Sequence, residues 1–297
     1  MSIWNLGSIN VDLFYRLPHL PLPGETLPAF AHETGLGGKG ANQSVAIARA
    51  GADVHHVGMI GPDNAWVLDR LGGYGVDVTH VGRNEAPTGH AIIMVDELGE
   101  NSIITYAGAN FAQLVGQIEE ALATAGPGDI LALQNEVSHI AEAAMIAQEK
   151  GMFVAYSAAP FKPEIVGRML PHVDLLVLNE IEAGQLAEAL GRPVEQIPVP
   201  NMLITLGARG AVWREQATGA VTEVAAFPVE AVDTTGAGDC FIGYVLAGLD
   251  QGLARAEAMR LGAAAAALKV TRPGTADAIP GRAEVNSFLG ESETDPA

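Results

Sequence analysis

Hydrophobic and polar residues are arranged along this chain in two kinds of segment, whose order predicts an α/β fold. Short uninterrupted apolar runs have the character of buried strands: Ile3–Leu6, Val54–Met59, Ile130–Leu133, Phe153–Tyr156, Leu175–Leu178 and Met202–Thr205. Other segments repeat apolar residues with helical spacing: Ala41–Ala50, Val115–Ala125, Ile140–Lys150 and Glu180–Leu190. Strands that alternate with helices in this way form a mostly parallel sheet flanked by helices.

Two segments depart from this alternation and predict a small antiparallel sheet. Residues 13–35 are rich in proline and show no helical period. Residues 86–106 contain two apolar runs on either side of Gly99, which is the pattern of a β-hairpin. Together they predict a lid inserted in a single domain that spans residues 1–297. A hairpin at the edge of the main sheet is the alternative that the pattern leaves open.

The composition is typical of a globular cytoplasmic protein. Of the 297 residues, 48% are hydrophobic, and the net charge of −19 disfavours nucleic-acid and membrane partners. The only cysteine, Cys240, permits no internal disulfide, as is usual in a reducing compartment. The N-terminus has no signal-peptide pattern, and no apolar run is long enough to span a membrane. We therefore expect a cytoplasmic protein.

A first glycine-rich stretch, Gly35–Asn42, leads into a predicted helix. It satisfies the G-x-G-x-x-G pattern of dinucleotide-binding folds, but the preceding segment is rich in proline instead of a clear strand. It is not a P-loop, because Glu33 and Gly40 stand where a glycine and a Ser or Thr belong. A tight turn with exposed N–H groups beside Lys39 and Asn42 suits hydroxyls or an anion. A helix start with a solvated lysine is an equally good interpretation at this point.

A second cluster, Asp233–Asp239, precedes an apolar run of helical length. Three small residues form its turn: Gly236, Ala237 and Gly238. Their N–H groups would lie at the positive end of a helix dipole, where they can stabilise the charge of a transferring phosphoryl group. Asp239 could take a proton from an attacking hydroxyl. An aspartate at a helix start is usually only a cap, but the small residues and a second acid, Asp233, make that interpretation less economical.

Glu182 is a weaker candidate, for a magnesium site. Phosphoryl transfer needs Mg²⁺, and Glu182 could reach a hydrated ion. It also stands in the first turn of a predicted helix whose N-cap is Asn179, where an acid is favourable in itself. The sequence has no HExxH, CxxC or GxSxG motif, and His55-His56 alone does not make a metal site.

These clusters, together with several shorter motifs, resemble the signatures of the PfkB carbohydrate kinases, most closely the ribokinase branch. The matching segments cover nearly the whole chain: Leu6–Asp12, Pro23–Thr26, Gly37–Gln43, Ala107–Asn110, Asn179–Glu182, Ile204–Gly207 and Asp233–Asp239. The resemblance implies a Rossmann-like core with a small β lid that often forms a dimer contact. It also implies ATP and Mg²⁺ as cosubstrate and cofactor.

The resemblance further implies roles for individual residues. Those expected to bind the sugar are Asn10, Asp12, Gly38, Lys39, Asn42 and Glu136. Asp239 is the expected catalytic base, and the expected anion hole is formed by Gly236, Ala237 and Gly238. The residues expected near the nucleotide and its Mg²⁺ are Asn179, Glu182, Thr205, Gly207, Gly210 and Gly238. A monovalent cation, usually K⁺, is implied between Asp233, Thr235 and the turn from Arg272 to Gly274.

Three positions depart from the ribokinase pattern without removing a catalytic group. Ser157 stands where an asparagine is common, Ala263 replaces a polar residue near the adenine, and Tyr106 replaces a histidine on the lid. The resemblance nevertheless implies phosphorylation of the 5-hydroxymethyl group of a pentose, ribose first. The rivals are a kinase for another small sugar or a nucleoside, a protein that binds sugar or nucleotide without turnover, and an oxidoreductase that uses the Gly35–Gly40 pattern.

Overall fold

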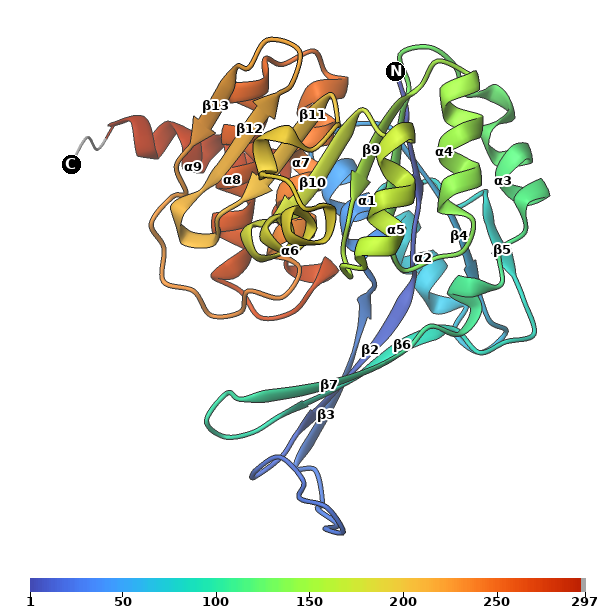
Figure 1. The fold of residues 1–297 in the computed structure, drawn as a ribbon. Helices are drawn as coiled ribbons and strands as arrows, with labels where there is room; N and C mark the ends of the chain where they lie inside the picture. The colour runs from blue at the N-terminus through green and yellow to red at the C-terminus, as the bar shows by residue number, and fades with distance from the viewer. Residues whose placement is uncertain (295–297) are drawn as a thin grey trace.

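The structure, a computed structural model, describes residues 1–294 of the chain, with side chains described as far as residue 290. At its centre lies a nine-stranded sheet (Figure 1). Its spatial order is β13 (Val221–Val224), β12 (Ala211–Glu215), β11 (Asn201–Thr205), β10 (Leu175–Asn179), β9 (Phe153–Ser157), β8 (Ile130–Gln134), β1 (Ile3–Leu6), β4 (Val54–Ile60) and β5 (Val81–Arg83). Neighbours from β11 to β5 are parallel, and β12 is antiparallel to both β11 and β13. The predicted mostly parallel sheet is confirmed.

Helices cover both faces of the main sheet, so the core has two layers, one on each face. One layer contains α1 (Lys39–Arg49), α2 (Trp66–Gly73), α7 (Ala237–Asp250), α8 (Arg255–Val270) and α9 (Arg282–Thr294). The other contains α3 (Val115–Ala121), α4 (Ile140–Glu149), α5 (Pro163–Met169) and α6 (Glu180–Leu190). Figure 1 shows α4, α5 and α6 on the side of the sheet that faces the viewer. None of the helices within residues 1–294 combines the length and apolarity that crossing a membrane would require.

Short 3-10 turns link several of these elements. They are η1 (Gly108–Phe111), η2 (Leu122–Thr124), η3 (Leu170–His172), η4 (Val194–Gln196), η5 (Gly207–Arg209) and η6 (Ala276–Ala278). The helix predicted over Val115–Ala125 ends at Ala121 and continues as η2. The other predicted helices and all six predicted strands are present, with ends that differ by a few residues.

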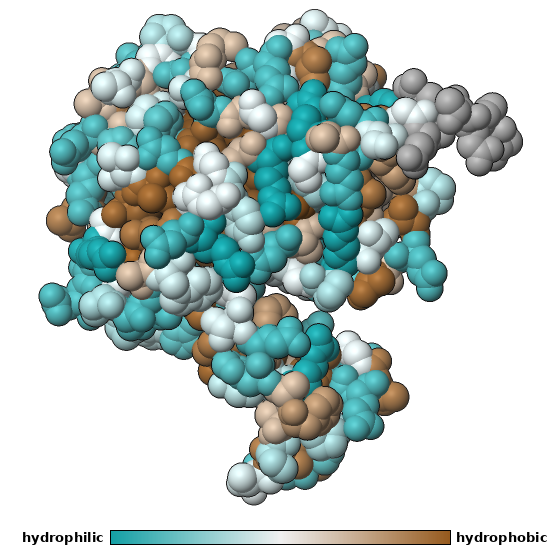
Figure 2. All heavy atoms as spheres, turned by 180° about the vertical axis from the view of Figure 1, so that it is seen from behind, coloured by the Kyte–Doolittle hydropathy of each residue, from teal (hydrophilic) through white to brown (hydrophobic). Residues whose placement is uncertain are grey.

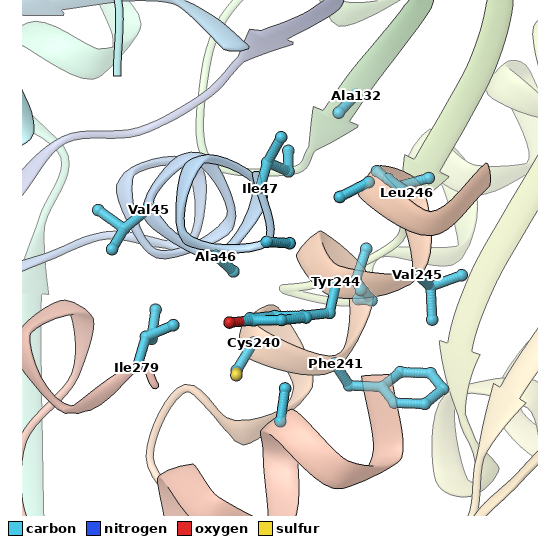
Figure 3. Close-up of a cluster of buried hydrophobic side chains, with 14 of the residues drawn as sticks. Val45, Ala46, Ile47, Ala132, Cys240, Phe241, Tyr244, Val245, Leu246 and Ile279 are labelled. Atoms are coloured by element: carbon cyan, nitrogen blue, oxygen red, sulfur yellow. The ribbon is translucent and has the colours of Figure 1, made fainter. Parts of the chain in front are cut away.

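Small residues let α1 and α7 pack closely. A Cβ atom added at Gly243 of α7 would come within 2.4 Å of the Ala46 Cβ atom of α1, so only glycine permits this separation. Figure 3 shows Ala46 and Ile47 of α1 beside Tyr244 of α7. Cys240 is buried in the same contact. The position of α7 relative to α1 is therefore set by side-chain volume at their contact.

A smaller four-stranded sheet projects from one edge of the main sheet (Figure 1). Its order is β3 (Ala31–Gly37), β2 (Asn10–Arg16), β6 (Gly89–Val95) and β7 (Asn101–Tyr106). The outer pairs are antiparallel, and the hairpin turns near Gly99 as predicted. The central pair, β2 with β6, is parallel. Both strands leave the main sheet from the same edge, after the parallel strands β1 and β5, and so run outward in the same direction.

Candidate active site

The carboxyl ends of five parallel strands meet at one edge of the main sheet. β1 leads into Ser8, β8 ends next to Glu136, and β9, β10 and β11 end at Ser157, Asn179 and Thr205. The chain crosses from β1 to β4 on one side and later returns to β8 on the other. Open α/β sheets bind ligands outside the carboxyl ends of their strands at such a switch point. The small sheet projects from this same edge, because β2 follows β1 directly.

Asp239 lies in the first turn of α7 at this edge, and only 7% of the residue is exposed. Asn42 Nδ2 donates to one oxygen of its carboxylate and Gln43 Nε2 to the other, each at 3.1 Å. The two amides orient the carboxylate and leave it lone pairs for a further donor. The N-cap of α7 is Gly236, whose φ of 72° is the left-handed conformation that favours glycine.

The contact between α1 and α7 produces this geometry. Asn42 and Gln43 lie about one helical turn before Ala46, and Asp239 lies one turn before Gly243. The close approach at Gly243 therefore brings the two amides to the carboxylate. Gln43 was not predicted as a site residue. Its role depends on how α1 is rotated against α7, and local sequence patterns carry no signal for that.

A chain of buried polar side chains continues behind Gln43. Gln134 Nε2 lies 2.8 Å from Gln43 Oε1 and 2.9 Å from Asn5 Oδ1. Asn5 Nδ2 donates to Ser44 Oγ at 2.8 Å, and Ser44 Oγ lies 2.8 Å from His56 Nδ1. Burial lowers the pKa of His56 to about 4, so the imidazole is neutral at physiological pH. This chain holds Gln43, and through it Asp239, without adding a charge.

Asp12 lies on β2 beside Gly37, just before the N-terminus of α1. The polar side chains of Asn10, Asp12, Lys39 and Glu136 in this region define the polar pocket of the site. Only 5% of the residue is exposed, and the Thr275 hydroxyl lies 3.2 Å from its Oδ2 atom. Burial raises the pKa of Asp12 to about 7; the Thr275 hydrogen bond opposes this rise, and the charge of Glu136 adds to it. Next to it, Asn10 Oδ1 accepts a hydrogen bond from Asn110 Nδ2 at 2.8 Å. These side chains offer both donors and acceptors to a small polar ligand.

Glu136 and Lys39 supply the charged groups of the pocket. Glu136 Oε2 accepts hydrogen bonds from Ser8 Oγ at 2.5 Å and from the Lys39 backbone N–H at 3.1 Å. The carboxylate of Asp239 raises the pKa of Lys39; burial opposes this rise, and the charge of Glu136 adds to it. The ammonium therefore stays charged at neutral pH, close to the carboxylate of Asp239.

An apolar cleft of about 460 Å³ opens beside the Gly236 turn. Four of the residues predicted near a nucleotide line it: Thr205, Gly207, Gly210 and Gly238. Phe227 and Ala263 contribute apolar walls. A slot of this kind beside the N-terminus of a helix fits a nucleotide, with its planar base in the slot and its phosphates pointing at the helix.

A narrower cavity of about 180 Å³ lies at the same helix start. Predicted site residues from distant parts of the chain line it: Lys39, Asn179, Glu182, Thr205, Gly236, Gly238 and Asp239. Of the three residues predicted to form an anion hole, Ala237 already directs its N–H to the Thr234 carbonyl at 3.2 Å. Both glycine clusters therefore meet in one channel between the polar pocket and the apolar cleft.

The chain matches a family model described as pfkB family carbohydrate kinase over residues 2–282. It belongs to the PfkB family of carbohydrate kinases. A ribokinase from Haemophilus influenzae is 34% identical over 96% of this chain and 97% of its own length. A deoxyribokinase from Salmonella typhi is 32% identical over 99% of this chain and 100% of its own length.

The fold of this PfkB kinase is also similar to that of solved ribokinases. The Arabidopsis thaliana ribokinase, solved in complex with ribose and ATP, has a TM-score of 0.85 at 30% identity. The match covers 97% of this chain and 98% of the Arabidopsis chain. The ribokinase from Thermotoga maritima has a TM-score of 0.87 at 32% identity, over 98% of this chain and 99% of the other. The resemblance and the ribokinase-like fold that the sequence predicted are confirmed.

Asn179 and Glu182 of the kinase form a capping box at the start of α6. The Asn179 side chain accepts a hydrogen bond from Glu182 N, and Glu182 Oε2 accepts one from Asn179 N, both at 2.8 Å. Asn179 is thus the predicted N-cap. Within residues 1–294 no cluster of three or more His, Cys, Asp or Glu residues could hold a metal ion. Mg²⁺ commonly binds through one or two carboxylates, its own waters and substrate phosphates, so a single glutamate beside the channel fits a hydrated ion.

Residues predicted to surround a monovalent cation lie together, with several polar groups already engaged. The Asp233 carboxylate accepts hydrogen bonds from Thr235 N at 2.8 Å and from Gly274 N at 2.9 Å. The guanidinium of Arg272 is paired with Glu284. These contacts tie the start of the second glycine cluster to the loop after α8.

Proposed function

We propose that this PfkB kinase transfers the γ-phosphoryl group of ATP to the 5-hydroxyl of ribose. One observation carries the proposal: the buried carboxylate of Asp239 lies at the start of α7, between a polar pocket and an apolar cleft. A sugar in the pocket and a nucleotide in the cleft would meet at that carboxylate. The ribokinases among its relatives, including one solved with ribose and ATP, support this choice of sugar.

Asp239 would act as the general base. As the sugar O5 attacks, its proton passes to the Asp239 carboxylate, the new O–P bond forms, and the bond to the β-phosphate oxygen breaks to release ADP. N–H groups of Gly236 and Gly238 and the ammonium of Lys39 would stabilise the charge on the transferring group. Because Asn42 and Gln43 orient the carboxylate before substrate binds, little reorganisation is needed.

The sugar itself would be held by polar side chains around the pocket. The proposed contacts are Asn10, Asp12, the Gly38 turn, Lys39, Asn42 and Glu136. Such a dense polar set favours a small polyhydroxylated molecule over a nucleoside, whose base needs an apolar or aromatic wall. Because one of the relatives is a deoxyribokinase, deoxyribose is a second candidate substrate.

ATP would lie in the apolar cleft along Thr205, Gly207 and Gly210, with its phosphates between Asn179 and Gly238. Mg²⁺ neutralises phosphate charge in such reactions, and Glu182 would hold the ion through water. If the enzyme still consumed ATP when a chelator was present in excess over Mg²⁺, the magnesium assignment would be contradicted.

Two further features complete the proposal. The small sheet would act as a lid that excludes water from the single kinase domain. Its exposed apolar side chains, such as Ile103 at 49% and Ile104 at 56% exposure, favour a homodimer formed through the lid.

Asp239→Asn tests the proposal directly. We expect kcat to fall about 100- to 10,000-fold, the usual contribution of a positioned base, while the KM for ribose stays near the wild-type value. A coupled assay of ADP release gives both constants. Asp69→Asn, on the exposed face of α2, is the matched control and should behave as wild type. An unchanged kcat in Asp239→Asn would exclude this residue as the base.

The same assay over a panel of sugars separates the rivals. We expect ribose to have the highest kcat/KM among pentoses, deoxyribose, hexoses and nucleosides. A preference for a nucleoside would favour the aromatic and apolar lid residues as a base-binding wall. ATP binding without ADP release for any sugar would favour a sensor, and binding of a nicotinamide cofactor would favour the oxidoreductase.

A further inference from the structure

Lys269 is a completely buried lysine in the last turn of α8, with 0% of the residue exposed. Lysine is almost never fully buried unless its charge is paired. Its ammonium donates to the Asp233 carbonyl oxygen at 2.8 Å and lies 4.0 Å from the Asp233 carboxylate. The C-terminal end of a helix, where Lys269 stands, also favours a positive charge. Nothing in the sequence pattern singled this residue out.

The Lys269 ammonium supports the first residue of the Asp233–Asp239 cluster. Besides this contact, the N–H groups of Val232 and Asp233 donate to the Val270 carbonyl at 2.7 and 3.0 Å. The backbone of Asp233 is therefore held on both sides by the end of α8. The turn at Gly236 and the carboxylate of Asp239 follow within one short stretch of chain.

The same anchor reaches the sugar pocket. The Asp233 carboxylate accepts a hydrogen bond from Gly274 N at 2.9 Å. Gly274 precedes Thr275, whose hydroxyl lies 2.7 Å from the Leu36 carbonyl and 3.2 Å from Asp12 Oδ2. Asp233 thus links the proposed phosphate-binding turn at Gly236 to Asp12, the proposed sugar-binding acid. The Lys269 ammonium lies beside Asp233.

This arrangement does not fit an added monovalent cation. The implied site lay between Asp233, Thr235 and the turn from Arg272 to Gly274. Here the Asp233 carbonyl already accepts from an ammonium, and its carboxylate accepts two backbone N–H groups. A second positive charge would share one partly buried carboxylate with Lys269, and like charges repel more strongly there than in bulk water.

We propose that the Lys269 ammonium is a built-in cation that positions the Asp233–Asp239 turn, so that this protein needs no K⁺. The inference rests on the proposed kinase function. Lys269 touches no substrate in this arrangement and is a positioning residue. An ammonium can take the place of K⁺ because the two carry the same charge and both bind carbonyl and carboxylate oxygens.

The first experiment compares salts at equal ionic strength. We expect wild-type kcat and the KM values to be the same in KCl and in tetramethylammonium chloride, whose cation is too large for a buried site. We expect Lys269→Ala to lose about 100-fold in kcat in tetramethylammonium, because a small displacement of the reacting groups can cost about that much, and to regain part of it in KCl. Lys162→Ala, an exposed lysine at the start of α5, is the control and should match wild type in both salts.

A second readout does not depend on turnover. A cation that binds only the folded state raises the melting temperature, so KCl should stabilise Lys269→Ala relative to tetramethylammonium and leave wild type unchanged. If wild type phosphorylates no sugar, the proposed function fails, and the melting comparison still tests Lys269. If Lys269→Ala does not fold, Lys269→Met keeps the volume without the charge.

Several results would overturn the inference. One is activation of wild type by KCl over tetramethylammonium. Another is a wild-type melting temperature that rises with K⁺. A third is a Lys269→Met protein with wild-type kcat in tetramethylammonium, because the charge would then have no role in positioning the turn.

Discussion

At the scale of single residues, Asp12 shows how burial changes the chemistry of a carboxylate. Its pKa is raised to about 7, so the unliganded protein exchanges this proton near neutral pH. In the proposed complex a sugar hydroxyl would donate to the ionised form, and sugar binding would therefore favour loss of the proton. Asp12 would then link the affinity for sugar to pH in the range where the enzyme would work.

The KM for ribose should consequently depend on pH. As pH falls below about 7, we expect KM to rise by up to about tenfold per unit, because Asp12 must lose its proton before it accepts from the sugar. Steady-state kinetics on both sides of pH 7 measure this. In Asp12→Asn the KM should be higher throughout and should lose this dependence.

Melting of the unliganded protein gives an independent check on Asp12. The pKa of this carboxyl is raised on folding from 3.8 to about 7, so its contribution to stability is full below 3.8 and is lost as pH rises through 7. Wild type should therefore lose stability relative to Asp12→Asn as pH increases over this range. If the melting temperatures of the two proteins changed with pH in parallel, the pKa of Asp12 would not be raised on folding.

At the scale of secondary-structure elements, the site depends on how closely α1 approaches α7. Gly243 leaves room for Ala46, and this separation places Asn42 and Gln43 within 3.1 Å of the carboxylate of Asp239. Figure 3 shows Tyr244 of α7 beside Ala46 and Ile47 of α1 at this contact. The orientation of the Asp239 carboxylate and the packing of the core are therefore consequences of the same contact.

Gly243→Ala should damage both stability and turnover. The new Cβ atom would lie 2.4 Å from the Ala46 Cβ atom, and overpacking of this kind costs about 1–3 kcal/mol. We expect a lower melting temperature, and a fall in kcat larger than any change in the KM for ribose, because the orientation of Asp239 is disturbed. Gly184→Ala in α6, where an added Cβ meets nothing within 4 Å, is the matched control and should be neutral or stabilising. If Gly243→Ala and Gly184→Ala changed the melting temperature and kcat equally, the contact between α1 and α7 would have no special role in orienting Asp239.

At the scale of the whole molecule, the small sheet exposes apolar side chains to solvent. Figure 2 shows hydrophobic residues interspersed with hydrophilic ones on this projecting sheet. Ile103 and Ile104, neighbours on β7, are 49% and 56% exposed. Neighbouring residues of a strand face opposite sides of a sheet, so each face of the small sheet carries exposed apolar surface.

Sedimentation of single-residue variants should identify the proposed dimer contact. We expect wild type to sediment as a dimer, and Ile103→Asp or Ile104→Asp, made separately, to yield a monomer because a buried unpaired charge is costly. The variant that dissociates shows which face of the lid is covered. Met145→Asp, an exposed methionine on α4 of the main body, should remain dimeric. A monomeric wild type would contradict the dimer.

Much of this architecture follows from the sequence, because its signals are local. Strands such as Ile3–Leu6 and Leu175–Asn179 are short apolar runs, and Asn179 with Glu182 is a capping box that any helix start of this composition would form. The Gly236 turn and Asp239 were recognisable because a left-handed glycine and a first-turn acid are properties of adjacent residues.

The tertiary structure decided what depends on contacts between distant segments. Asn42 and Asp239 are 197 residues apart, and no periodicity specifies that their helices meet at Gly243 or that Gln43 joins them. The ammonium of Lys269 is a similar case. Its residue type alone predicts a solvated side chain, and only the packing of α8 beneath the Asp233 turn removes it from water and gives it a carbonyl to bind.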